Sequence, residues 1–254
     1  MASYLARKFK SSAKARRREA LISFAPSRLR GRFFHAVGRL ILLLGAGLAP
    51  LAAADSRENL STFFVGRLSF GSNKGGDCGD IGGDLVKLVA RASTIQVSEK
   101  KLLKIADISL FETPFVFMNG HDDFTLSAEE LENVRHYLRN GGFVFASGCC
   151  TNPAFPRAWR REFSRIFPGA KVQAIPYDHL IYRSFYKMDR LTSVEKGNIH
   201  LEGLFHDGEL VAVMSEDGLC CSFAMDGSCN RGRGVPPDEA KKIALNICVY
   251  ALTH

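Results

Sequence analysis

The stretch PFVFMNGHDDFTLSAEELENVRHYLRNGGFVFASGCC, residues 114–150, determines the fold that we predict for this chain. Two short apolar runs, Phe115–Met118 and Phe143–Ala146, are typical of strands that are covered on both faces. A helix is expected between them, starting after Ser127. The order strand, helix, strand predicts a βαβ unit with parallel strands and a right-handed crossover.

The predicted helix has matching signals at both of its ends. Ser127 and Glu130 have the spacing of a capping box, and Leu126 and Leu131 have that of a hydrophobic staple. Gly141 stands where a left-handed C-terminal cap is expected. The helix is therefore expected to begin directly after Ser127 and to end before Gly141.

Strands and helices also alternate through the rest of the chain, and residues 216–235 are expected to be irregular. The pattern predicts an α/β fold: a flavodoxin-like, doubly wound and mainly parallel sheet with an antiparallel hairpin late in the chain. The further elements that we expect are a strand at Phe63–Phe70, a helix capped by Asp84, a strand at Thr94–Val97, a helix with Pro156 in its first turn, a strand at Lys171–Ile175, a hairpin of His200–Phe205 with Glu209–Met214, and a last helix at Asp238–Leu252.

The basic charge of the chain is confined to its N-terminal region. Of 34 basic and 26 acidic residues, eleven basic residues and one acid precede residue 55, which leaves 23 basic against 25 acidic residues in the remainder. Because the body of the protein has no basic excess, we predict no nucleic-acid partner.

An apolar segment, LILLLGAGLAPLAAA at residues 40–54, follows the basic region and ends in Ala52-Ala53-Ala54. A basic start, an apolar stretch and a small-residue end are typical of a secretory signal peptide. We therefore predict a signal peptide at residues 1–54, a single domain at residues 55–254, and export to the periplasm or cell envelope. The main alternative is an uncleaved N-terminal membrane anchor, and only then is membrane contact expected.

Polar residues gather just after the two strands of the predicted βαβ unit. Parallel sheets place their ligand sites at the carboxyl ends of their strands, and Asp178-His179 is expected at the same edge. A glycine-rich segment at residues 71–83 could approach a ligand there. The predicted ligand-binding residues are Asn119, His121, Asp122, Ser147, Asp178 and His179.

Some of these residues could also carry catalysis. His121 could act as a general base oriented by Asp122, and Cys149 or Cys150 could be a nucleophile. A nucleophile elbow has glycine two residues before and two residues after the nucleophile, and only Gly148 is present here. The alternative is that Asp122 and its neighbours are ordinary turn residues.

All seven cysteines of the chain lie after residue 54. Six of them fall on predicted strand-end loops, where they could form disulfides or bind a soft metal through thiolates. These six are Cys78, Cys149, Cys150, Cys220, Cys221 and Cys229, and no CxxC spacing occurs among them. Cys248 is instead expected to pack inside the last helix as a small apolar residue.

Several segments in the same order resemble a known exported bacterial family. They are residues 115–121, 126–143, 160–169, 177–182 and 201–203 and the closing NICVYALTH. Over roughly residues 63–254 the chain resembles the family known as domain of unknown function four-one-five-nine. Two departures are Leu180, where the family usually has proline, and Cys149-Cys150, where many relatives carry acidic residues.

The resemblance implies a fold of the class I glutamine-amidotransferase-like type, without implying amidotransferase activity. Active members of that superfamily use a cysteine on an elbow and a later His-x-Glu, which His200-Leu201-Glu202 matches in order. We predict a domain that binds a small molecule or an envelope protein at the sheet edge, with no cofactor. The alternatives are a hydrolase-like enzyme using His121 with a carboxylate or cysteine, and a cysteine-based metal or redox site.

Overall fold

The computed structural model describes residues 62–74, 81–223 and 234–254, and its centre is a sheet of seven strands. In spatial order these are β2 (Val97–Lys104), β1 (Phe63–Ser69), β3 (Phe115–Gly120), β4 (Phe143–Gly148), β9 (Glu209–Ser215), β8 (Glu202–His206) and β5 (Val172–Ala174). Neighbours from β2 through β9 pair in parallel, whereas β8 is antiparallel to both β9 and β5. The predictions of a mainly parallel α/β sheet and of a late antiparallel hairpin are confirmed.

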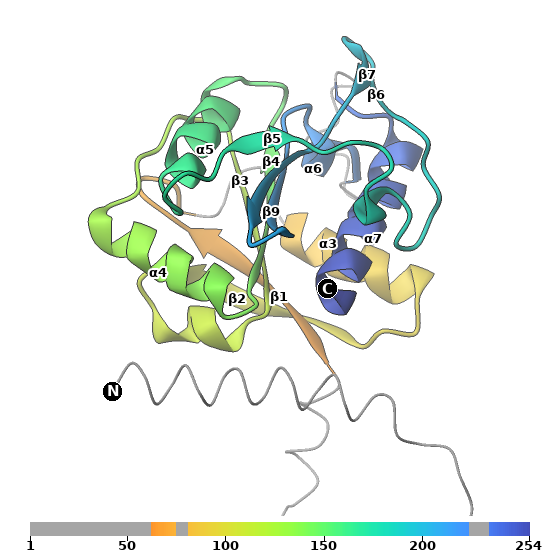
Figure 1. The fold of residues 1–254 in the computed structure, drawn as a ribbon. Helices are drawn as coiled ribbons and strands as arrows, with labels where there is room; N and C mark the ends of the chain where they lie inside the picture. The colour runs from red at the N-terminus through yellow and green to blue at the C-terminus, as the bar shows by residue number, and fades with distance from the viewer. Residues whose placement is uncertain (1–61, 75–80, 224–233) are drawn as a thin grey trace, which may run out of the picture. The chain divides into compact units, whose positions relative to one another are not determined.

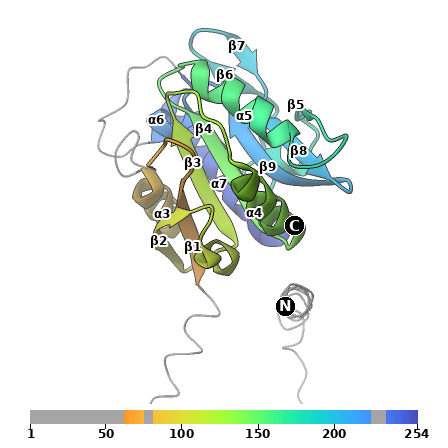
Figure 2. The ribbon, with the colours of Figure 1, turned by 90° about the vertical axis from the view of Figure 1, so that its left-hand side faces the viewer.

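Helices cover both faces of this sheet. Figures 1 and 2 show α3 (Ile81–Ala92) and α7 (Pro237–Thr253) on one face, and α4 (Ala128–Arg139) and α5 (Ala154–Ser164) on the other. The remaining elements are the short helices η1 (Ile108–Glu112), η2 (Leu180–Tyr182) and α6 (Leu219–Phe223), and a separate hairpin of β6 (Leu191–Ser193) and β7 (Gly197–Ile199). None of the described helices combines the length and apolar character needed to cross a membrane.

The two strands that frame α4 are buried along their whole length. Phe115 and Phe117 pack in the core under α3 and α7, and Val116 and Met118 pack in the core under α4 and α5. The residues of β4 alternate in the same way between the two cores. Both strands therefore read as continuous apolar runs, because each face of the sheet meets a helical layer.

The predicted start of α4 is confirmed in detail. The Ser127 hydroxyl accepts a hydrogen bond from the Glu130 amide at 3.1 Å, and the Glu130 carboxylate accepts one from the Ser127 amide at 2.8 Å. Glu130 also accepts the amide of Gly71 at 3.0 Å, which ties the loop after β1 to this helix. At the other end, Gly141 has a φ of 89°, the left-handed conformation predicted for it.

Three expected elements differ from the structure. Helix α3 begins at Ile81, so Asp84 lies in its first turn and pairs with Lys87 at 3.2 Å instead of capping it. Strand β2 covers residues 97–104 rather than Thr94–Val97, because parallel pairing with β1 extends it through a charged segment. The segment predicted to be irregular contains α6.

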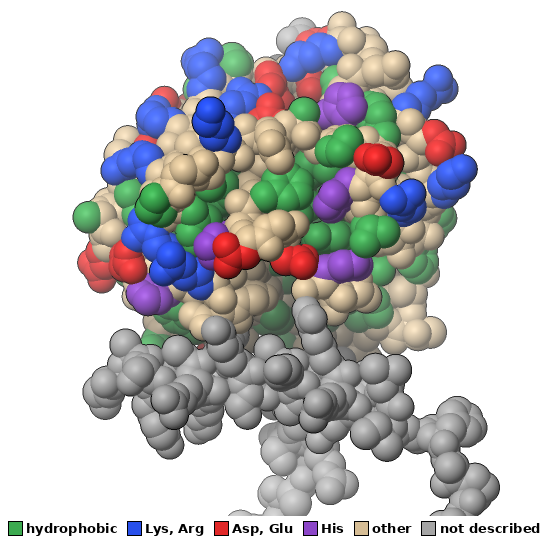
Figure 3. All heavy atoms as spheres, in the orientation of Figure 1, with side chains coloured by type: hydrophobic (Ala, Val, Ile, Leu, Met, Phe, Trp, Pro, Cys, Tyr) green, Lys and Arg blue, Asp and Glu red, His purple; other side chains and the backbone are tan. Residues whose placement is uncertain are grey.

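Charged side chains of both signs are interspersed on the surface. The face seen in Figure 3 carries Lys and Arg side chains among Asp and Glu side chains. Part of this mixture is α5, whose arginines pair with acids: Arg161 with Asp123 at 2.9 Å, and Arg165 with Glu162 at 2.6 Å. The positive charges of these arginines are therefore balanced by neighbouring carboxylates.

Replacing Ser127 with Ala should lower the free energy of unfolding by about 1 kcal/mol, because the Glu130 amide loses its acceptor. Urea unfolding followed by circular dichroism measures the change. The neighbouring exposed residue gives a matched control, since Glu129→Gln should change stability by less than about 0.5 kcal/mol. Equal effects of the two substitutions would contradict a role for the capping box.

Candidate functional site

Four cysteines, two from the turn after β4 and two from helix α6, come together beyond the carboxyl ends of β4 and β9. The sulfur of Cys149 lies 3.6 Å from that of Cys220, and the sulfur of Cys150 lies 3.8 Å from that of Cys221. The Cys220 and Cys221 sulfurs are 3.8 Å apart. Cys149, Cys220 and Cys221 are buried, and Cys150 is partly exposed. We call these four residues the cysteine cluster.

The first half of the cluster sits on a sharp turn between β4 and α5. The Cys149 amide continues the pairing of β3 with β4 by donating to the Gly120 carbonyl at 2.9 Å. Cys150 and Thr151 then both adopt positive φ, 53° and 58°, a conformation that costs energy in residues with a side chain. Gly148 is required at this point, because a Cβ there would lie 2.9 Å from both the Glu216 carbonyl oxygen and Pro156.

The second half of the cluster is carried by α6, which is fixed to β4 by a hydrogen bond. The Cys220 amide donates to the Ser147 hydroxyl at 3.1 Å. The Cys150 amide in turn donates to the Cys221 sulfur at 3.4 Å. Backbone and hydroxyl groups thus hold the two Cys-Cys pairs side by side.

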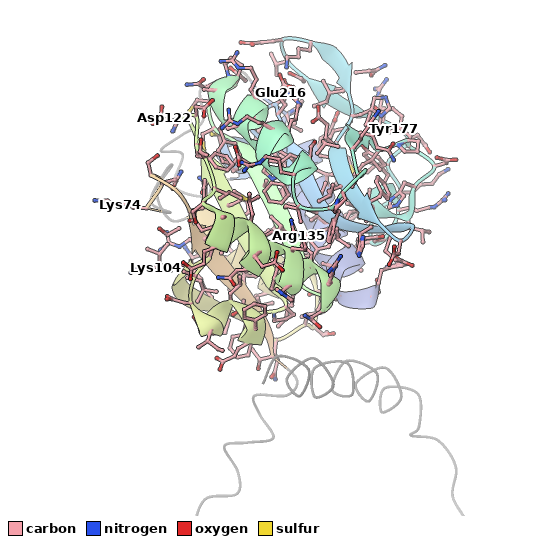
Figure 4. All side chains as sticks on the ribbon, turned by 60° about the vertical axis from the view of Figure 1, so that its left-hand side comes forward. Lys74, Lys104, Asp122, Arg135, Tyr177 and Glu216 are labelled. Carbon is pink, nitrogen blue, oxygen red and sulfur yellow. The ribbon has the colours of Figure 1, made fainter. Side chains whose placement is uncertain are left out.

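The loop that leads into α6 is also held by ion pairs. Arg160 on α5 binds Glu202 on β8 at 2.7 Å and pairs with Glu216 as well, while Lys196 contacts Glu216 at 3.0 Å and Asp217 at 2.9 Å. Burial alone would raise the pKa of Glu216, but its bonds to Arg160 and Lys196 outweigh burial and lower that pKa. Glu216 therefore stays ionised and keeps the loop in place; Figure 4 shows it near the upper edge of the molecule.

Two predicted polar residues, one at the end of β3 and one directly after it, contact the cluster. The Asn119 side-chain amide donates to the Cys149 sulfur at 3.3 Å, and the His121 Nε2 atom lies 3.4 Å from the Cys150 sulfur. Of the predicted ligand-binding residues, the structure therefore brings Asn119, His121 and Ser147 to one place with the cysteines. The contribution of α6 had no sequence signal beyond the second Cys-Cys pair, since the segment was expected to be irregular.

The remaining predicted ligand-binding residues are Asp122, Asp178 and His179. Asp122 is exposed and directly follows His121, and Figure 4 labels it at the upper left of the molecule. The loop after β5 turns back over the sheet, so the His179 ring packs on Phe205 and Tyr250, 5.8 Å and 5.4 Å between ring centres. Phe205 pairs with Leu210 at the start of β9, the end opposite α6. The expectation that Asp178-His179 shares an edge with the cysteines is therefore wrong.

The two residues of the His-x-Glu match, His200 and Glu202, also bind partners outside the cysteine cluster. His200 contacts the Ile175 carbonyl oxygen through Nδ1 at 3.0 Å, and Glu202 binds Arg160. Cys248 is buried inside α7 as predicted, and burial raises the pKa of its thiol. Cys78 and Cys229 lie outside the described residues.

The spacing of the cluster sulfurs is compatible with the geometry of a bound metal ion. Zinc–sulfur bonds of about 2.3 Å place the sulfurs of a tetrahedral site about 3.8 Å apart. The three measured neighbour separations are 3.6, 3.8 and 3.8 Å. The sulfurs of Cys149, Cys220 and Cys221 also all lie within 4.8 Å of one another. No disulfide joins any of the five cysteines that the structure describes.

Comparison with protein families gives a match for most of this domain. Residues 80–252 match the family model described as Domain of unknown function (DUF4159). The chain belongs to this family. The predicted family is confirmed, and the matched residues include the complete cysteine cluster. A search of curated proteins gave no match.

His179 should make the stability of this DUF4159 domain dependent on pH. Burial, together with the positive charges of His254 and Arg183, lowers the pKa of His179, against opposing effects of Asp178 and Glu209. Its Nδ1 atom accepts the Ile181 amide at 3.2 Å, which requires that nitrogen to be unprotonated. The unfolded chain therefore binds a proton at His179 more readily than the folded chain does. The stability that neutral His179 contributes is complete above about pH 6.5 and is lost as the pH falls below that value.

Thermal unfolding between pH 7.5 and pH 5.5 tests this expectation. The wild type should lose more stability over this range than His179→Asn, which keeps a capping acceptor but does not titrate. Parallel pH profiles for the two proteins would show that His179 is not responsible.

Proposed function

We propose that this protein binds a soft divalent metal ion, with zinc as the best fit, at the cysteine cluster. The observation that carries the proposal is the set of sulfur separations, 3.6 to 3.8 Å, which match the edge of a zinc–thiolate tetrahedron. Cys149, Cys220 and Cys221 are the core ligands, because their sulfurs all lie within 4.8 Å of one another. Cys150, whose sulfur is 3.8 Å from that of Cys221, would become the fourth donor by rotation of its side chain towards the other three. The site keeps the predicted place at the sheet edge but has a metal ion as its ligand.

The surroundings of the sulfurs support this assignment. Thiolate ligands favour zinc and other soft metals over magnesium or calcium. The Asn119 amide that donates to Cys149, and the Cys150 amide that donates to Cys221, stabilise negative charge on those sulfurs. Burial of three of the four cysteines limits access of water, as is usual in closed structural sites.

A hydrolase-like enzyme is the second candidate, and the contact between His121 and Cys150 is the observation in its favour. A separation of 3.4 Å allows the imidazole to accept the thiol proton, and Cys150 is the partly exposed cysteine of the cluster. This candidate requires Cys150 to remain unligated, so bound metal would inhibit the hydrolysis.

We also propose that the domain has a flavodoxin-like fold of the class I glutamine-amidotransferase-like type. The order β2-β1-β3-β4 followed by β9 is the strand order of flavodoxin-like sheets. It supports the flavodoxin-like, class I glutamine-amidotransferase-like fold that the family resemblance implies. His200 and Glu202 both have other partners, which argues against amidotransferase chemistry at that pair.

We also propose that the protein is exported after cleavage of residues 1–54, on the basis of the charge and hydropathy pattern of that segment. Expression of the full chain in a bacterial host, followed by N-terminal sequencing of the protein from the periplasmic fraction, should give a chain that begins at Asp55. A cell-associated protein that retains residues 40–54 would contradict cleavage and favour the anchor.

Full-length protein purified under reducing conditions should contain about one zinc ion per chain by elemental analysis. Replacing Cys220 with Ser should weaken zinc binding by more than the roughly 10- to 100-fold that loss of an outer-shell partner costs. Asn119→Leu should fall within that smaller range. Competition with a chromogenic chelator measures the affinities, and cobalt substitution should give the absorption of a tetrahedral thiolate complex.

The matched control is Cys248→Ala, which removes an equally buried cysteine away from the cluster. Its zinc content and affinity should equal those of the wild type. Wild-type protein without zinc, or equal zinc binding by Cys220→Ser and Cys248→Ala, would overturn the proposal. Circular dichroism establishes that each variant is folded before its affinity is compared.

A further inference from the structure

We infer that the cysteine cluster also carries a thiol–disulfide exchange site, in which Cys150 is the attacking thiol and Cys221 is the resolving thiol. The inference goes beyond metal binding, because it concerns the same sulfurs when no metal occupies them. It rests on the different exposure of the four cysteines, on the pairing of their sulfurs and on the conformation of the turn at Cys150.

Exposure singles out Cys150 as the point of entry. Cys149 and Cys220 are fully buried, and Cys221 is 6% exposed. Cys150 is the one partly exposed member of the cluster. A disulfide in solution must reach the attacking sulfur along the axis of its own bond, so burial excludes Cys149 and Cys220 from the first step. The His121 ring lies against the Cys150 sulfur at 3.4 Å.

Pairing singles out Cys221 as the resolving thiol. Its sulfur is 3.8 Å from that of Cys150, and the Cys150 amide donates to it at 3.4 Å. A disulfide requires a sulfur–sulfur distance of about 2.05 Å, so oxidation requires the two sulfurs to approach each other from their present contact. The other pair, Cys149 with Cys220, lies behind them in the core at 3.6 Å.

The turn at Cys150 gives the sulfur a defined position. Two successive residues with side chains, Cys150 and Thr151, have positive φ, and Gly148 packs directly against Pro156 and the Glu216 carbonyl. Such strain persists where the surrounding structure holds it, and it is concentrated at functional sites. The geometry is consistent with a thiol that is held towards solvent beside its partner.

The exchange balances with a small-molecule disulfide RSSR as the oxidant. The Cys150 sulfur attacks one sulfur of RSSR, the S–S bond of RSSR breaks, and the departing RS⁻ takes up the proton of the Cys150 thiol to give RSH. The Cys221 sulfur then attacks the Cys150 sulfur, and a second RSH leaves with the proton of Cys221. The two cysteines lose two electrons and RSSR gains them.

The test uses the full-length protein, reduced and freed of metal with a chelator, and glutathione disulfide as the probe. Tryptic digestion without reduction should join residues 140–157 to residues 197–231, with Cys150 bonded to Cys221. Cys221→Ser should accumulate a glutathione mixed disulfide on Cys150. Cys150→Ser should react at least about tenfold more slowly, because the remaining thiols of the cluster are buried. Cys248→Ala should behave as the wild type.

Modification of Cys149 or Cys220 before Cys150, a Cys220–Cys221 disulfide in the wild type, or an unchanged rate in Cys150→Ser would overturn the inference. Circular dichroism of the metal-free protein establishes that it remains folded, and the same reaction on the protein as purified gives a second measurement. Zinc content is measured on the reduced protein before oxidation. Failure of exchange with zinc present therefore leaves the metal proposal intact, and exchange without zinc binding contradicts only the metal proposal.

Discussion

Burial of β3 and β4 on both faces is the constraint on which the rest of the structure depends. Every residue of the two strands is buried, with the phenylalanines of one face under α3 and α7 and the smaller side chains of the other face under α4 and α5. Such strands have no free face on which to carry a functional group. Polar and nucleophilic side chains can therefore stand only where these strands end, and the cysteine cluster lies at that edge.

The sequence was most informative where local chemistry and packing agree. The capping box at Ser127, the left-handed Gly141 and the two apolar strands were all predicted, because each depends on residues a few positions apart. The late hairpin was predicted for the same reason, from two neighbouring runs at His200–Phe205 and Glu209–Met214. Strand β2 was placed too early, because its charged residues become a strand only through pairing with β1.

The site was predicted less well, because its geometry depends on contacts between distant segments. The positions of Asn119, His121 and Ser147 followed from the topology of a parallel sheet. The meeting of Cys149 with Cys220 depends on a hydrogen bond between Ser147 and α6, a five-residue helix that is too short to produce a recognisable periodic pattern. His179 was misplaced for a related reason: the chain after β5 folds back over the sheet instead of stopping at its edge.

The two halves of the cluster are far apart along the chain, with the paired cysteines 71 positions apart. During synthesis the first two thiols emerge on a nearly complete β3–β4 unit well before β9 and α6 exist. Until then, Cys149 and Cys150 lack the neighbours that later enclose them. The order of synthesis thus separates an early period, in which these thiols are open to any partner, from a late one, in which the C-terminal segment encloses them.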